Sequence, residues 1–105
     1  DMAKMMKAAQ EMQQKMASLQ EEMHKLLVTG ESGAGLVKAT CTAKGELKGL
    51  DIDPSIFNAD DKEVVEDLIV AAIKDAQAKA AEAAQDEMGK VTEGLALPPG
   101  MKLPF

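Results

Sequence analysis

Few residues in this sequence could carry acid–base or nucleophilic chemistry. His24 is the sole histidine and Cys41 the sole cysteine, so a catalytic arrangement would have to join His24 to Cys41 or to a serine. His24 falls near the end of a predicted helix, where a half-exposed surface histidine is the simpler interpretation. Cys41 falls on the apolar side of a predicted strand and is interpreted as a small buried hydrophobe. We therefore predict no catalytic residue and no enzyme.

Three glycines and two aspartates are the other candidates for ligand binding. The spacing of Gly30, Gly33 and Gly35 matches neither GxGxxG nor GxxxxGK[ST], and a strand rather than a helix follows it, which favours a hairpin turn over a phosphate site. Asp51 and Asp53 would share one side of a strand. Two carboxylates without a histidine or a third ligand make a poor metal site. We expect no metal and no cofactor.

The balance of charge bears on whether nucleic acid can be a partner. The 105 residues contain 12 basic and 18 acidic side chains, for a net charge of −6, and every basic residue is a lysine. Phosphate binding needs clustered cations, so this total argues against it. However, residues 58–93 hold ten acids and four lysines, whereas residues 1–27 hold four of each. Lysines of the first helix could therefore still meet a duplex.

The remaining composition limits the class of protein. Aromatic residues make up 2% of the chain, which excludes the base-stacking platforms that bind single strands. The length predicts a single domain over residues 1–105 with an aliphatic, Met-rich core. One unpaired cysteine favours a reducing cytoplasm, and the longest strongly apolar run, residues 68–73, is too short for a membrane helix. We expect a cytoplasmic protein without membrane contact.

A heptad-like pattern predicts a long first helix over about residues 2–27. Apolar residues recur there at spacings of three and four without an intervening glycine or proline. A helix of this length is longer than so small a domain can cover, so a second copy of the chain is expected to pack on it. The alternative is packing on the second helix of the same chain. The predicted dimer seam consists of Met5, Met12, Met16, Leu19 and Met23.

The rest of the chain predicts strands and then a second helix. Alternating polar and apolar residues within about 28–53 predict a three-stranded antiparallel sheet. Asp60 is the predicted N-cap of a helix over about 60–90, with Glu63 in capping-box spacing. Residues 95–105 are rich in proline and apolar side chains and predict a docking tail. The predicted fold class is α+β, in the order α-β-β-β-α.

Four stretches of the sequence together resemble the YbaB/EbfC family of bacterial nucleoid-associated proteins. They are residues 28–38 (VTGESGAGLVK), 51–55 (DIDPS), 66–76 (EDLIVAAIKDA) and 97–105 (LPPGMKLPF). The resemblance implies an intertwined, tweezer-like homodimer in which the sheets join at the centre and the long helices project. It also implies binding to duplex DNA, location on the nucleoid, and effects on chromosome organisation and gene expression. Family genes often lie beside recombination and replication genes, which suggests such proteins as further partners.

The residues that would touch DNA under this resemblance are lysines. We predict that Lys4, Lys7 and Lys15 contact phosphate, with Lys38 and Lys44 of the sheet as lesser candidates. Lysine is a point charge suited to phosphate, whereas the bidentate contact to guanine usually comes from arginine, which is absent. The expected binding is weak, broad in sequence and strongly salt-dependent. The alternative is a dimeric protein-interaction module, built on the Met-rich helix and the tail, with little direct DNA binding.

Overall fold

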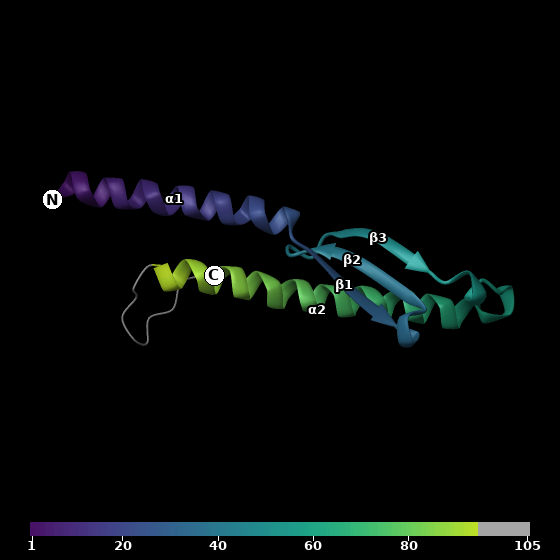
Figure 1. The fold of residues 1–105 in the computed structure, drawn as a ribbon. Coiled ribbons are helices and arrows are strands. Elements are labelled where there is room, and N and C mark those ends of the chain that lie inside the picture. Colours follow the sequence, from purple (N-terminus) through teal and green to yellow (C-terminus); the bar gives the residue numbers. More distant parts are fainter. Residues whose placement is uncertain (95–105) are drawn as a thin grey trace.

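The computed structural model describes the backbone of residues 1–94 and the side chains through Val91, so the expected docking tail lies outside the described residues. Figure 1 shows two long helices and a small sheet in an elongated molecule. The described elements follow the predicted α-β-β-β-α order and confirm the α+β fold class. They are α1 (Met2–Lys25), β1 (Leu27–Ser32), β2 (Val37–Thr42), β3 (Leu47–Ile52) and α2 (Lys62–Gly94).

The sheet is antiparallel with the strand order β1-β2-β3. Its alternation is clearest in β2, where Val37, Ala39 and Cys41 are fully buried on the side that α2 covers. The turn between β1 and β2 has positive φ at three consecutive residues, 58° at Gly33, 56° at Ala34 and 90° at Gly35. Glycine adopts this conformation at little cost, so the glycine-rich segment is a turn, as predicted.

The first half of α2 lies unusually close to β1 because both surfaces are made of small residues. Ala72, Ala76 and Ala80 are at most 1% exposed and line the helix face against the sheet. A Cβ atom on Gly30 would lie 2.1 Å from the backbone nitrogen of Ala76. Polar contacts fix the same junction, since the backbone N–H of Glu31 donates to the Asp75 carboxylate at 2.9 Å. This hydrogen bond is the main cause of the lowered pKa of Asp75.

The last turns of α1 pack on the C-terminal half of α2 in the same chain. Leu19 and Met23 are each 5% exposed, and Met16 packs beside them. Their neighbours on α2 are Ala83, Ala84, Met88 and Val91. Three of the five members of the predicted dimer seam thus have partners within their own chain. For these three, the packing is the one that the alternative interpretation expected. Whether the seam also meets a second copy stays a prediction.

The entry into α2 differs from the predicted one. Asn58 caps the 3-10 turn that leads into α2, because its side chain accepts from the backbone N–H of Asp60, and Asp60, the predicted cap, lies inside that turn. A 3-10 turn over Ala59–Asp61 precedes the α-helix. This turn places the start of the α-helix at Lys62, two residues after the predicted cap. The helix ends at Gly94.

Candidate nucleic-acid interface

The helix α1 forms an arm whose two ends have different surroundings. Its first turn is capped by Asp1, whose carboxylate accepts from the backbone N–H of Ala3 at 3.0 Å. The exposed fractions of Met2, Met5 and Met6 are 78%, 71% and 61%, whereas the last turns are buried against α2. In Figure 1 the N-terminal turns reach beyond the yellow end of α2. Among the described residues, the first turns of the arm are therefore exposed.

The three lysines predicted to contact phosphate all lie exposed on this arm. No salt bridge joins Lys4, Lys7 or Lys15 to any residue that the structure describes. Three other lysines of the two helices are paired with a carboxylate on their own helix. The pairs are Lys25–Glu21 at 3.6 Å, Lys79–Asp75 at 3.0 Å and Lys90–Glu87 at 2.9 Å. Three of the four lysines of α1 are therefore without a described carboxylate partner.

The two sheet lysines lie in other surroundings and are not brought together with the arm lysines. Lys38 stands opposite Glu31 on one neighbouring strand and opposite Asp51 on the other. Side chains of directly opposite residues on adjacent strands are close enough to interact, so the two acids weaken the positive field around Lys38. Lys44 lies in the exposed turn between β2 and β3. The sheet therefore offers a weaker phosphate surface than α1.

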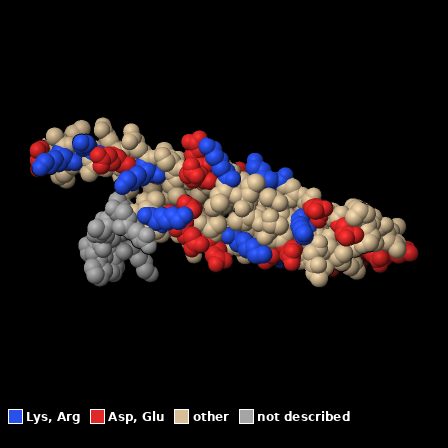
Figure 2. All heavy atoms as spheres, in the orientation of Figure 1, with Lys and Arg blue, Asp and Glu red and all other residues tan. Residues whose placement is uncertain are grey.

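Charges of both signs are interspersed over the molecule. Figure 2 shows blue and red atoms alternating along α1, with red atoms gathered at the opposite end, around the start of α2. The acidic residues there include Asp60, Asp61, Glu63, Glu66 and Asp67. A duplex approaching that end would be repelled, whereas the arm presents alternating charge. Charge alone therefore makes the α1 end a better surface for an anion than the start of α2.

A side-chain cluster that the sequence did not predict joins α1 to the sheet. His24 Nδ1 lies 2.9 Å from Glu46 Oε1. Thr42, which is fully buried, donates its hydroxyl to the same oxygen at 3.2 Å and accepts from the backbone N–H groups of Lys44 and Glu46. The hydrogen bond with His24 is the main cause of the lowered pKa of Glu46. These contacts fix the inner end of the arm.

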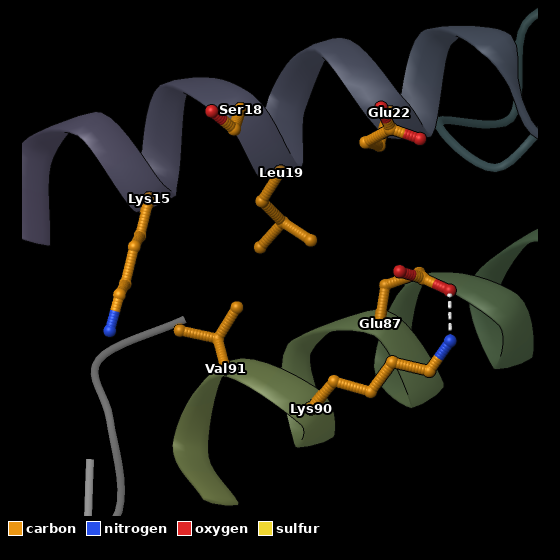
Figure 3. A pocket seen from close by; sticks show the side chains of 7 residues that line it. All are labelled: Lys15, Ser18, Leu19, Glu22, Glu87, Lys90 and Val91. Atoms are coloured by element: carbon orange, nitrogen blue, oxygen red, sulfur yellow. Dashed lines mark hydrogen bonds and ion pairs between the residues drawn. The ribbon is translucent and has the colours of Figure 1, made fainter. Parts of the chain in front are cut away.

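The groove between the two helices holds a mixed set of side chains. Its volume is about 310 Å³, and Figure 3 shows Leu19 and Val91 facing each other with polar residues around them. Lys90 is tied to Glu87, whereas the Lys15 ammonium has no described carboxylate partner. The lining is completed by Ser18 and Glu22. Carboxylates and ammonium groups alternate here, so the groove is not a specialised anion site.

The structure does not bring the catalytic candidates together. Cys41 is fully buried in the cluster with Ala72 and Ala76, whereas His24 lies on the surface beside Glu46. Asp53 accepts from the backbone N–H of Ser55 at 2.8 Å, which is the hydrogen bond of a turn. The pKa of Asp53 is lowered first by a hydrogen bond with the Ser55 side chain and then by this backbone bond. Within the described residues, no helix is long and apolar enough to cross a membrane, and no group of three or more potential metal ligands occurs.

Comparisons with known proteins agree with this architecture. The model of the YbaB/EbfC DNA-binding family matches residues 1–95. A nucleoid-associated protein of Methylocella silvestris is 50% identical over 105 residues, covering 100% of this chain and 98% of that protein. A nucleoid-associated protein of Agrobacterium fabrum is 51% identical with the same coverage. The crystal structure of an uncharacterized protein from Helicobacter pylori shares the fold, with a TM-score of 0.67, 23% identity, and coverage of 90% of this chain and 96% of that chain.

Proposed function

Because this chain belongs to the YbaB/EbfC DNA-binding family, we propose that it is a nucleoid-associated protein that binds duplex DNA as a homodimer. Binding occurs through lysines on α1, with weak or broad sequence preference. Its consequence in the bacterial cell is an effect on chromosome organisation and gene expression. The protein acts in the cytoplasm, on the nucleoid, and its reaction with DNA is binding rather than catalysis.

The exposed lysines of the arm are the main structural support for this proposal. Lys4, Lys7 and Lys15 have no described carboxylate partner, so their charge is available to phosphate without breaking an ion pair. DNA binding by such groups releases condensed counterions, and this release is the main source of affinity in sequence-tolerant binding. A two-fold axis would supply the same three lysines twice, which offsets the small number on each chain.

A salt titration tests the proposal directly. The dissociation constant for a 20-base-pair duplex is measured by fluorescence anisotropy at several concentrations of sodium chloride. We expect the logarithm of the binding constant to fall linearly with the logarithm of salt, with a slope near −0.9 for each phosphate neutralised. A slope near zero, or no binding at low salt, would reject DNA as the ligand. Light scattering of the same sample tests the homodimer separately.

Exposed apolar residues favour a second candidate function, that of a dimeric protein-interaction module in recombination or replication. Met2, Met5 and Met6 are exposed on the arm, and methionine is common on adaptable protein-binding surfaces. At the other end, Phe57 is 67% exposed beside a groove of about 300 Å³ that Ala59 and Val65 also line. This function predicts retained partner binding in a variant that no longer binds DNA.

A further inference from the structure

The face of α1 that points away from α2 carries a distinct set of side chains. Successive residues of an α-helix are rotated by about 100°, and Leu19 and Met23 define the side that is buried on α2. The opposite side is a stripe of residues spaced by three and four, which we call the outer stripe. It consists of Ala3, Lys7, Gln10, Gln14, Ala17, Glu21 and Lys25.

The N-terminal part of the outer stripe suits close approach to another molecule. Gln10 and Gln14 are exposed, and neither side chain forms a hydrogen bond with a described residue. The small residues Ala3 and Ala17 lie at its two ends, and it contains no acid between them. Two amides without a described hydrogen-bond partner therefore occupy the centre of the part of the helix that the described residues leave exposed.

Lysines lie beside these two glutamines, together with one acid, Glu11, which is four residues from both Lys7 and Lys15. Lys7 lies on the outer stripe one turn before Gln10 and Gln14, and Lys4 and Lys15 lie to one side of it. The major groove of DNA admits an α-helix, and phosphates line its edges. With the outer stripe facing the groove floor, the flanking lysines lie toward the phosphates of one strand. The glutamine amides then lie toward the base edges.

We propose that Gln10 and Gln14 read adenine in the major groove, so that the protein prefers A·T over G·C pairs. Glutamine can donate to N7 and accept from the N6 amino group of adenine at once, a pairing that no other base offers in the same arrangement. The inference rests on the proposed DNA binding through α1 and deepens it. The expected preference for A·T pairs is modest, because only two side chains on each chain supply it.

Competition between matched duplexes tests the proposal. A·T-rich and G·C-rich 20-base-pair duplexes compete for the protein at one salt concentration, and a third duplex carries 7-deazaadenine, which lacks the N7 acceptor. We expect an affinity ratio of about fivefold or more in favour of A·T, the lower limit for one good bidentate contact. The ratio should fall close to one for the Q10A/Q14A variant and for the 7-deazaadenine duplex.

The control variant changes the same residue type away from the outer stripe. Gln13 and Gln20 are exposed on the flank of α1, so the Q13A/Q20A variant should keep the ratio of the unaltered protein. Alanine is the best helix former, so both double variants should keep their helical circular dichroism. Binding without an A·T preference, or a preference that survives Q10A/Q14A, overturns this inference and leaves the proposed function intact. Failure to bind any duplex at low salt overturns both.

Discussion

The backbone nitrogen of Ala76 lies only 2.1 Å from the position that a Cβ atom on Gly30 would occupy. Two further backbone atoms of α2, the Ala76 Cα and the Ala72 carbonyl oxygen, lie within 2.7 Å of that position. Backbone atoms of a helix cannot move aside individually as a side chain can. The contact therefore sets how closely α2 approaches the sheet.

Substitution of Gly30 by alanine should consequently destabilise the fold. We expect a loss of about 3 kcal/mol or more in the free energy of unfolding, because α2 must shift as a unit. This loss is at the upper end of the range that is typical when a core is overpacked. Urea denaturation followed by circular dichroism measures it. Gly49 is the matched control, since nothing lies within 4 Å of its Cβ position. A G30A variant as stable as G49A would show that the helix is not held at this distance.

Replacing Lys4, Lys7 and Lys15 together by glutamine should weaken DNA binding without changing the mass of the assembly. Each lost phosphate contact should reduce the magnitude of the salt slope by about one. The matched control replaces Lys25, Lys79 and Lys90, which removes the same charge from lysines that are already paired. Equal losses of affinity in the two triple variants would mean that net charge, rather than the arm, determines binding.

The uncovered members of the seam should support a dimer. Met5 is 71% exposed and Met12 is half-buried within the single chain, so a second copy could still cover both. We expect the M5Q/M12Q variant to dissociate at concentrations where the unaltered protein is dimeric, as measured by sedimentation equilibrium. Met6 is similarly exposed at 61% but lies off the seam, so M6Q should leave the dimer unchanged. Full dimerisation of M5Q/M12Q would place the interface elsewhere.

Acid should loosen the joint between α1 and the sheet through Glu46. The pKa of this carboxyl is lowered below its ordinary value of 4.5, first by the hydrogen bond with His24. A lowered pKa in the folded state contributes stability that is fully present above the unfolded pKa. That contribution is lost as the pH falls through the folded pKa.

Thermal unfolding at a series of pH values tests this contribution. Between about pH 5 and pH 3, the melting temperature of the unaltered protein should fall more steeply than that of E46Q, which has no such carboxyl to protonate. D51N is a suitable control, because Asp51 lies exposed on β3 outside this cluster. Parallel profiles for the unaltered protein and E46Q would mean that the His24 contact adds nothing to stability.

Local patterns predicted the elements of this fold better than its contacts. The alternation of polar and apolar residues within about 28–53 identified the three strands and the burial of Cys41. These features depend on residues close in sequence. The cap at Asn58 was missed because several capping residues lie side by side there, and only the backbone path selects among them.

The contacts between elements needed the tertiary structure. Thr42 falls on the polar side of the strand pattern, yet it is fully buried because the turn to Glu46 folds back over it. The approach of Gly30 to Ala76 joins residues that no short-range pattern relates. For the interface, the sequence predicted exposed lysines on α1 but not the carboxylates that pair with Lys25, Lys79 and Lys90.

Because α1 is attached to the rest of the chain near one end, a small rotation there moves its other end by a much larger distance. With 24 residues, the helix is about 36 Å long, and its described contacts with the rest of the chain are concentrated near the end that carries Leu19, Met23 and His24. A tilt of about 10° at that end would displace the other by roughly 6 Å, about the width of a minor groove. A small rearrangement beside Glu46 would therefore move Lys4 and Lys7 by several ångströms. In the proposed complex, these lysines would then contact different phosphates.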